Sequence, residues 1–331
     1  MTKLSWGVLS TAKIGQTQVI PAIQRSANGE VVAIASRNEK VKEVAKELDI
    51  PKAYTSYDAL LDDPDIDAVY IPLPNSLHKQ WVIEAAKKGK HILCEKPAAL
   101  DYDELKEMTD ACEKYGVTFM EAFMYQFHPQ HDKVKELIKA GEIGDVAFMR
   151  ASFSFFLNDG ENIRLNNELG GGSLYDVGCY TLHSICHVLD DLPTKVYANA
   201  KLHPEFQVDT TTAGVLTFAN GVQGSFDSSF DVVPRQSYQV VGSKGTIEVV
   251  DAFRPDKNEN GEGLIRVTKE DGKVEELKVN GDQYKLQVEH FAASVLEGKQ
   301  PSYSNEKILN NMKVLDACYK SIKTGNSVEV N

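Results

Sequence analysis

The chain of 331 residues lacks the features of several protein classes. No apolar run approaches the ~20 residues of a membrane-spanning helix, and the first residues do not follow a signal-peptide pattern. We therefore expect a cytoplasmic protein with no membrane partner. A basic block is also missing, because 36 Lys and Arg face 48 Asp and Glu, which gives a formal charge of −12. Such an acidic chain is a poor candidate for nucleic-acid binding.

Cysteine is scarce and shows no pairing pattern. The five cysteines are widely spaced, and none belongs to a C-x-x-C motif. This favours reduced thiols over a disulfide framework or a zinc ribbon. His183 and His187, with Cys186 between them, have a spacing that can bind zinc, but the segment has no H-E-x-x-H motif and no obvious third ligand. We therefore predict no metal. Ser225–Ser229 has no G-x-S-x-G context, which makes a serine hydrolase improbable.

The length suggests two domains, and the pattern of the sequence changes after Glu121. Up to that point, short apolar runs alternate with helical segments of about ten residues or more, as in βαβ units. Right-handed crossovers then favour a doubly wound parallel sheet. The first domain is predicted to span residues 1–121. Its strands are expected at 4–9, 31–35, 68–73, 91–94 and 117–120.

The second domain, residues 122–331, is predicted to be α+β with an open, mainly antiparallel sheet. Its turn signals include Asn220-Gly221 and Asp271-Gly272, which favour hairpins because they tolerate positive φ. Residues 256–263 are polar and are expected to form a mobile loop. We expect the last helix to be able to pack back on the first domain. The other predicted elements are helices at 131–140, 173–189, 284–296 and 306–323 and an aromatic strand at 146–157.

Small residues follow the first predicted strand. Laid on the dinucleotide fingerprint G-x-G-x-x-G, the segment reads Ser10-x-Ala12-x-x-Gly15. Such a turn brings backbone N–H groups close to a pyrophosphate and lets the helix pack against the strand. Taken alone, the match fits an ordinary βα turn equally well, but its position in a βαβ unit favours dinucleotide binding. The residues predicted to bind the pyrophosphate are Ser10, Thr11, Ala12, Ile14 and Gly15.

The end of the second strand indicates which cofactor is preferred. A site selective for NAD expects Asp or Glu there, to bind the ribose 2′-hydroxyl. This chain has Ser36 and Arg37 instead, and an arginine can pair with a 2′-phosphate. We therefore predict NADP, with NAD as the alternative. The competing interpretation is that Arg37 is a surface residue before a helix.

Two further motifs follow the predicted strands 68–73 and 91–94. The first is Pro74-Asn75-Ser76-Leu77-His78, and the second is Glu95-Lys96-Pro97. Both should lie at the carboxyl edge of the sheet, where α/β proteins bind ligands. On its own, a lysine between Glu and Pro fits a structural ion pair better than a catalytic group.

A third set of residues lies on the predicted helix 173–189. Asp176, Tyr180 and His183 stand at i, i+4 and i+7, so they share one face. Three consecutive glycines precede this helix and let the backbone pass close to another surface. A free tyrosine has a pKa of ~10, too high for efficient base catalysis near neutrality. A neighbouring lysine charge favours the phenolate, which makes Lys96 and Tyr180 a plausible pair.

Together with Met124–Pro129 and Gly170–His183, these motifs resemble those of the glucose-fructose oxidoreductase / inositol dehydrogenase / rhizopine-catabolism (Gfo/Idh/MocA) family. The resemblance covers essentially the whole chain. It implies a Rossmann domain followed by an α+β domain, and NAD(P)-dependent oxidation or reduction of a sugar, polyol or related hydroxy compound. Within the family, Tyr180 makes this chain similar to the branch that contains glucose-fructose oxidoreductase, dimeric dihydrodiol dehydrogenase and NADP-dependent xylose dehydrogenase, which also have tyrosine at this point of the motif. Two departures are Ser10, where many members have glycine, and Gln126, where many have arginine.

The resemblance also implies roles for individual residues. Lys96 matches the lysine near the nicotinamide and the reacting oxygen, and Tyr180 is expected to exchange the proton. Asp176 and His183 would position the substrate or Tyr180, and Arg164 is expected to reach the substrate. The cofactor-binding set is completed by Ser36, Arg37, Pro74, Asn75, His78, Glu95 and Lys96. The alternatives are a non-catalytic NADP(H)-binding sensor and a redox-neutral sugar-converting enzyme that retains NAD.

The second domain also predicts an oligomer. The strands 146–157, 215–218 and 222–230 are apolar, and one helix layer is not expected to cover both faces of their sheet. Phe153, Phe155 and Phe156 alternate only in part, so an aromatic residue is expected on the second face. A two-fold contact would bury such a patch. We therefore expect a homodimer or a dimer of dimers.

Overall fold

The computed structural model describes residues 2–330, which form two compact units. Unit 1 contains the chain up to Met124 together with Tyr284–Leu309, and unit 2 contains Tyr125–Gln283 together with the chain from Asn310. The first boundary thus follows Met124 rather than Glu121. The return of residues 284–309 to unit 1 has a packing reason, because the ring of Phe291 lies 5.1 Å from that of Trp6.

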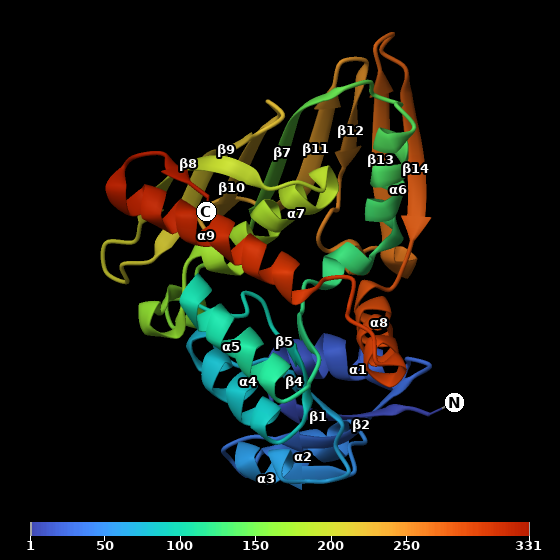
Figure 1. Cartoon of the computed structure of the whole chain (residues 1–331), viewed down its shortest axis with the longest axis vertical. Coiled ribbons are helices and arrows are strands. Elements are labelled where there is room, and N and C mark those ends of the chain that lie inside the picture. The colour runs from blue at the N-terminus through green and yellow to red at the C-terminus, as the bar shows by residue number, and fades with distance from the viewer. Residues whose placement is uncertain (1, 331) are drawn as a thin grey trace. The chain divides into compact units, whose positions relative to one another are not determined.

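Unit 1 is built on a six-stranded parallel sheet with the order β3-β2-β1-β4-β5-β6 (Figure 1). The order reverses between β1 and β4, which confirms the doubly wound sheet and places its ligand-binding crevice at the carboxyl ends of the strands. The strands are β1 (Leu4–Leu9), β2 (Gly29–Ala35), β3 (Lys52–Tyr54), β4 (Ala68–Ile71), β5 (His91–Cys94) and β6 (Phe119–Glu121).

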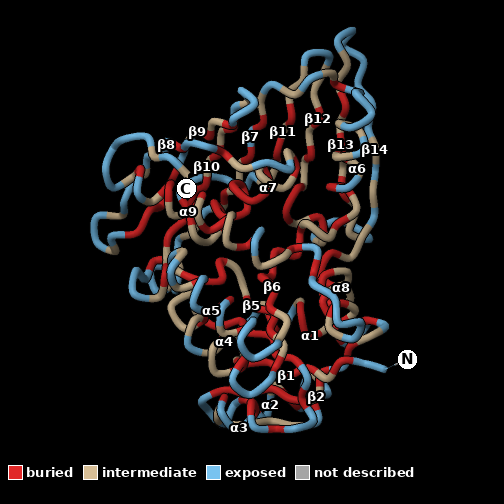
Figure 2. Tube along the Cα trace, in the orientation of Figure 1, coloured by how far each residue is buried: buried red, intermediate tan, exposed pale blue. Residues whose placement is uncertain are grey.

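Helices on both faces explain why these strands read as continuous apolar runs. All four residues of β4 are buried, and five of the six in β1 are (Figure 2). The short, half-buried β3 lacks such a run and was not predicted. The helices of this unit are α1 (Ile20–Gln24) after a π-helical turn (Gly15–Val19), α2 (Val41–Glu47), α3 (Tyr57–Leu61), α4 (His78–Lys87), α5 (Tyr102–Lys114) and α8 (Gln283–Glu297).

Unit 2 holds a nine-stranded sheet with the order β14-β13-β12-β11-β7-β10-β9-β8-β15. All pairs are antiparallel except β7 with β10, so the expected mainly antiparallel sheet is confirmed. The strands are β7 (Val146–Ser154), β8 (Pro193–Leu202), β9 (Asp209–Phe218), β10 (Gln223–Ser229), β11 (Arg235–Gly242), β12 (Gly245–Val249), β13 (Glu262–Lys269), β14 (Val274–Asn280) and β15 (Val328–Glu329).

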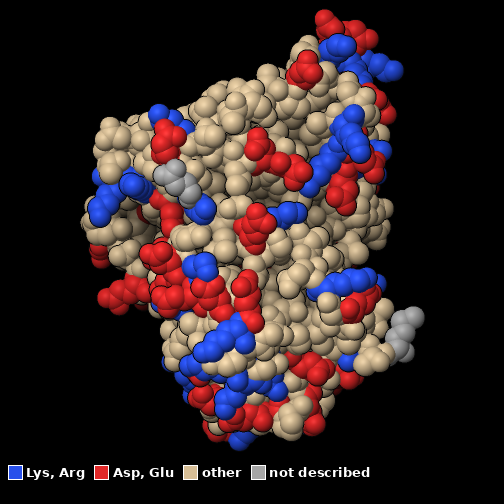
Figure 3. Space-filling model, viewed as in Figure 1, with Lys and Arg blue, Asp and Glu red and all other residues tan. Residues whose placement is uncertain are grey.

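Helices cover one face of this sheet (Figure 1). They are α6 (Pro129–Lys139), α7 (Cys179–Leu189), and the part of α9 (Asn305–Thr324) from Asn310 onward. Burial accordingly alternates along the strands, as in β13, where Ile265 and Val267 are buried but Arg266 is not. Gly221 and Gly272 adopt positive φ in hairpin turns, as their dipeptides predicted. Acidic and basic side chains both occur on each unit in the view of Figure 3.

Two expectations for unit 2 need correction. The segment 256–263 is not an open loop, because it contains two 3-10 turns and the start of β13. Asp256 anchors it by accepting two hydrogen bonds from Arg254, at 2.9 and 2.8 Å, and one from Gln283.

Within residues 2–330, the structure contains no helix both long and apolar enough to cross a membrane.

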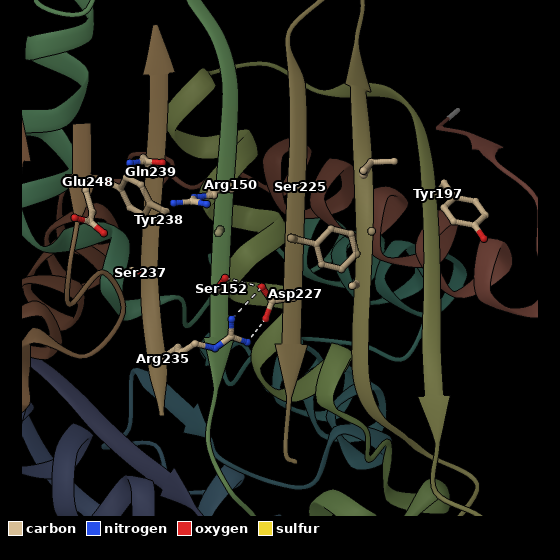
Figure 4. Close-up of a pocket in the computed structure, with 15 residues that line it drawn as sticks. Arg150, Ser152, Tyr197, Ser225, Asp227, Arg235, Ser237, Tyr238, Gln239 and Glu248 are labelled. Carbon is tan, nitrogen blue, oxygen red and sulfur yellow. Dashed lines mark hydrogen bonds and ion pairs between the residues drawn. The ribbon is translucent and has the colours of Figure 1, made fainter. Parts of the chain in front are cut away.

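The second correction concerns the uncovered face of the sheet, which is mixed rather than apolar (Figure 4). Arg235 donates hydrogen bonds to Asp227 and Ser154 on this face. One aromatic side chain on this face is Tyr197 of β8 (Figure 4), whereas the phenylalanines near the end of β7 are placed differently. Phe153 stacks on the buried Phe253, Phe155 packs on Phe230, and Phe156 is 65% exposed beyond the end of β7.

Candidate active site

The turn after β1 has the backbone conformation that usually requires glycine. Ser10 has a φ of 127°, which an L residue rarely adopts. Its hydroxyl stabilises the turn by accepting a hydrogen bond from the Ala12 N–H at 2.9 Å and donating one to the Pro72 carbonyl at 3.2 Å. The serine that departs from the fingerprint therefore keeps the shape of the turn and ties it to the loop after β4.

At the end of the same turn, Gly15 has room for a side chain of one carbon. A Cβ added to Gly15 would lie 3.7 Å from both Pro72 Cγ and Tyr70 Cε1, which is ordinary contact. Thr11 offers its carbonyl to the Gln16 side chain at 2.6 Å. Ser10–Gly15 thus forms a compact turn at a helix start, the arrangement that receives a pyrophosphate.

Arg37 lies exposed just beyond the end of β2, and no carboxylate stands at the strand end. Its guanidinium lies close enough to the Tyr57 hydroxyl to influence its pKa. Burial raises the pKa of Tyr57, and the arginine opposes that effect. Ser36 is buried, and its N–H donates to the Tyr54 carbonyl at 3.0 Å. The exposed Arg37 guanidinium is suited to bind a 2′-phosphate, while the Ser36 N–H ties the end of β2 to β3.

His78 is fully buried at the start of α4. Its Nδ1 lies 3.0 Å from the Pro97 carbonyl oxygen, and its Nε2 lies 2.8 Å from that of Leu73. Burial lowers its pKa to about 4. The imidazole therefore joins the loops after β4 and β5, and its ring is enclosed between them.

The loop after β5 carries Lys96, which is half-buried and joined to Pro97 by a cis peptide bond. The carboxylate of Glu95 accepts a hydrogen bond from the Tyr70 hydroxyl at 2.6 Å. Glu121, at the end of the neighbouring β6, was missed in the sequence. The sequence feature that could have revealed it is a single acidic residue inside the apolar run from Phe119 to Phe123.

In unit 2 the predicted helical face begins with a π-helical turn, Leu174–Gly178, that continues into α7. Asp176 accepts a hydrogen bond from Arg164 Nε at 2.6 Å. The charge of Asp176 and its hydrogen bond raise the pKa of Arg164 against its burial, and Tyr180 adds a smaller electrostatic effect in the same direction. The structure therefore groups Arg164 and Asp176, with Tyr180 close enough to influence the arginine.

Aromatic rings surround Tyr180, which is 6% exposed. Its ring lies 5.3 Å from Phe153, 5.6 Å from Phe253 and 5.7 Å from Tyr125. Behind it, His183 Nδ1 is 2.5 Å from the Tyr125 hydroxyl. The phenol is thus held by packing, and His183 is positioned to hold Tyr125 within that packing.

The start of this helix depends on Asp209, which the sequence did not reveal. This buried carboxylate accepts hydrogen bonds from Ser173 Oγ and Leu174 N, both at 2.7 Å. A Cβ on Gly172, whose φ is 122°, would lie 2.3 Å from Asp209 Oδ1, and one on Gly171 would lie 2.5 Å from the Arg164 carbonyl oxygen. The glycines are therefore needed for the close approach of Arg164 and Asp209 to the helix start.

The histidine pair considered for zinc has other neighbours. His183 contacts Tyr125, while the Lys135 ammonium lies 3.0 Å from Nε2 of His187. The two imidazole rings stack at 5.4 Å. Across residues 2–330, the structure contains no cluster of three or more His, Cys, Asp or Glu suited to a metal ion.

Comparison with known proteins now identifies the family. The family model described as an oxidoreductase family with an NAD-binding Rossmann fold (GFO_IDH_MocA) matches residues 4–123, and the GFO/IDH/MocA C-terminal domain matches residues 131–248. The chain belongs to the GFO/IDH/MocA family. The resemblance inferred from the motifs of the sequence is thereby confirmed, as is the α/β fold class.

Individual members of the GFO/IDH/MocA family show how far the similarity extends. The D-xylose 1-dehydrogenase (NADP(+)) 2 of Haloferax volcanii is 44% identical, over 99% of this chain and 100% of the relative. The trans-1,2-dihydrobenzene-1,2-diol dehydrogenase of Xenopus laevis is 35% identical over 74% of each chain. The solved structure of KijD10, a 3-ketoreductase from Actinomadura kijaniata in complex with NADP and TDP-benzene, gives a TM-score of 0.92 at 28% identity, covering 97% of this chain and 98% of that one.

Proposed function

We propose that this protein is an NADP-preferring oxidoreductase that transfers a hydride between the nicotinamide and a carbon of a cyclic sugar, polyol or dihydrodiol. Among these, an aldose such as D-xylose is the first candidate, since the relative that is 44% identical over nearly the whole chain is named for it. The observation that carries the proposal is the Arg164–Asp176 pair near Tyr180, in the C-terminal domain of a family oxidoreductase. Such a set can orient hydroxyl groups and exchange a proton.

The cofactor assignment has support in unit 1. Ser10 takes up a glycine-like backbone conformation, and its hydroxyl accepts from the Ala12 N–H across the turn. Ser10, Thr11, Ala12, Ile14 and Gly15 would hold the pyrophosphate. Arg37 would pair with the 2′-phosphate, and Ser36 would hold the strand end beside it. The segments Pro74–Asn75 and Glu95–Lys96 would border the nicotinamide, with His78 fixing both loops.

Bound NADP would supply the acceptor or donor of the hydride. In the direction of oxidation, the C–H bond of the substrate gives up a hydride, and its hydroxyl gives up a proton as the carbonyl forms. Lys96 would donate a hydrogen bond to the reacting oxygen, and Tyr180 would take the proton as the phenolate that a positive charge favours. Asp176 and Arg164 would orient other hydroxyl groups of the substrate, while His183 would hold Tyr125 against Tyr180.

The experiment is a panel of aldoses, polyols and dihydrodiols with NADP⁺ and with NAD⁺, read at the absorbance of reduced nicotinamide. We expect turnover with at least one pyranose, faster with NADP⁺ than with NAD⁺. Binding of NADPH without turnover of any substrate would favour the sensor. Purified protein that carries NAD it never exchanges would instead favour a redox-neutral sugar-converting enzyme.

The uncovered sheet face of unit 2 supports a proposal about assembly. A hollow of about 700 Å³ opens on it, lined by residues such as Arg150, Asp227 and Arg235 (Figure 4). Val215 is 48% and Tyr197 40% exposed beside these polar groups. We propose that this face pairs with a second copy in a homodimer or a dimer of dimers. Light scattering at micromolar concentration tests this, and a monomer would contradict it.

A further inference from the structure

A buried carboxyl group in unit 1 has no part in the proposed reaction. Glu121, the last residue of β6, is 2% exposed and follows the buried Phe119 and Met120. Burying a carboxylate is costly unless hydrogen bonds and a counter-charge replace its hydration. A group kept in such a place is expected to have a task, and its partners indicate which one.

Both oxygens of Glu121 accept hydrogen bonds. Oε1 accepts from the Ala98 N–H at 2.8 Å, and Oε2 accepts from the Tyr303 hydroxyl at 3.0 Å. Ala98 lies two residues after Lys96 on the same loop. Because His78 contacts the Pro97 carbonyl oxygen, the loop that carries Lys96 is held from two sides, by an imidazole and by a carboxyl group.

The charged and titratable groups around Glu121 lie on three elements. Lys96 and Glu95 are on the loop after β5, Cys94 is at the end of β5 beside Glu121, and Tyr303 precedes α9. Burial raises the pKa of Glu121 to about 7, against the two hydrogen bonds and the charge of Lys96, while Glu95 adds to the rise. The Lys96 charge therefore favours the ionised carboxylate.

We propose that Glu121 is a positioning residue for Lys96: its carboxylate holds the Ala98 amide, and with it the loop, and supplies a counter-charge to the Lys96 ammonium. This rests on the proposed role of Lys96 at the reacting oxygen. A carboxylate can accept from both Ala98 and Tyr303. A protonated carboxyl group must turn one oxygen into a donor, and of the two partners only the Tyr303 hydroxyl can accept. Protonation therefore reverses the hydrogen bond with Tyr303, weakens Oε1 as the acceptor of the Ala98 amide, and removes the counter-charge to Lys96.

The test compares Glu121→Gln with Tyr303→Phe in the full chain. Glutamine keeps the volume and an oxygen for the Ala98 amide but removes the charge. We expect kcat to fall about tenfold or more and the KM for NADP⁺ to change less than about threefold. In the wild type, kcat should rise through neutral pH as Glu121 ionises, and this rise should disappear in Glu121→Gln. Tyr303→Phe removes a donor that lowers the pKa of Glu121. It should keep kcat within about threefold at its plateau and move the rise to higher pH.

A second measurement does not depend on turnover. In protein labelled with ¹⁵N-alanine, the Ala98 amide proton should shift with pH near neutrality, because its acceptor titrates. The shift should move to higher pH in Tyr303→Phe and vanish in Glu121→Gln. Wild-type kcat and an unchanged pH profile in Glu121→Gln would overturn the proposal, and so would an Ala98 resonance that ignores pH in the wild type. If no substrate is turned over, the proposed function fails, and the amide titration still decides whether Glu121 holds the loop. If Glu121→Gln does not fold, the Tyr303→Phe shift decides.

Discussion

The two units bury their sheets in different ways. In unit 1 the central strands are covered on both faces, and the residues proposed to bind the cofactor lie on loops at the strand ends. In unit 2 one face of the sheet carries helices and the other carries Arg150, Asp227 and other polar side chains. There the residues proposed to contact the substrate are Asp176 in the π-helical turn, Tyr180 in the following α7, and Arg164 in a separate 3-10 turn, Ile163–Leu165.

This difference separates two ways of holding a reactive group. Backbone hydrogen bonds and buried side chains such as His78 and Glu121 fix the loops of unit 1. In unit 2, packing fixes Tyr180, which is surrounded by the rings of Phe153, Phe253 and Tyr125. Substitutions should accordingly act through loop geometry in the first case and through the side chain itself in the second.

The largest effect on kcat is expected for Lys96 of unit 1 and Tyr180 of unit 2, the two residues proposed to contact the reacting oxygen. Tyr180→Phe keeps the ring and its packing but removes the proton acceptor, so kcat should fall by ~10²–10⁴-fold while cofactor affinity stays close to that of the wild type. Lys96→Met should also lower kcat. If the two groups act as one unit, the double variant should be little worse than the poorer single one. Steady-state kinetics check this, and a Tyr180→Phe enzyme with wild-type kcat would move the proton transfer elsewhere.

A smaller effect is expected for cofactor choice, which we assign to unit 1 alone. Arg37→Ala should lower kcat/KM with NADP⁺ by about 10–100-fold, because a charge-assisted hydrogen bond of ~1.5–3 kcal/mol is lost, and should leave NAD⁺ nearly unaffected. Lys42→Ala, which removes an exposed charge from α2, is the matched control. An unchanged ratio of the two kcat/KM values in Arg37→Ala would show that the 2′-phosphate binds elsewhere.

Glycine substitutions compare the packing of the units directly. A Cβ on Gly214 in β9 would lie 2.5 Å from the Tyr197 carbonyl oxygen and 2.6 Å from Phe226 Cε1. Gly214→Ala should therefore lower the free energy of unfolding by ~1–3 kcal/mol. Gly15→Ala in unit 1 meets only ordinary contacts, so its effect should stay within about 0.5 kcal/mol. Chemical denaturation measures both, and equal losses would contradict the contrast.

The smallest effect concerns stability against pH in unit 1. The folded pKa of His78 is about 4, below its ordinary 6.5, so its contribution to stability is lost as the pH falls through that interval. The folded pKa of Glu121 is about 7, above its ordinary 4.5, so its contribution is lost as the pH rises through that interval. The two slopes oppose each other between about pH 4.5 and 6.5. Relative to the wild type, Glu121→Gln should gain stability as the pH rises, which urea titrations at several pH values would detect.

Much of the fold could be predicted because the central strands of unit 1 are uninterrupted apolar runs in the sequence. The segments at β1, β4 and β5 are continuous and buried, and they were placed nearly at their observed bounds. The strand β3 was missed because Lys52–Tyr54 is short and half-buried. A return to unit 1 was expected for the last helix, but it is made by Tyr284–Leu309, and α9 belongs to unit 2 from Asn310 onward. Nothing local in a helical sequence says against which sheet the helix packs.

The site was only partly predictable for a similar reason. Motif spacing brought Asp176 and Tyr180 together on one helix, and the structure adds the hydrogen bond from Arg164 to Asp176. By contrast, Glu121 and Asp209 act through partners far away in the chain: Tyr303 is 182 residues from Glu121, and Ser173 is 36 residues from Asp209. A single acid in an apolar run shows that it is buried but not what it binds.

The contact between Trp6 and Phe291 has a consequence for synthesis on the ribosome. A hydrogen bond from the same region, Asn28 to the Glu289 carbonyl, joins residues 261 positions apart. At a translation rate of ~5–20 residues per second, roughly 15–50 s pass between the appearance of the two partners. During that time Trp6, which is fully enclosed in the finished protein, lacks the side chain that covers it. Unit 1 begins first but is completed only after residues 125–283 of unit 2 have been made. Until residues 284–309 arrive, the nascent chain must keep an apolar surface from aggregating.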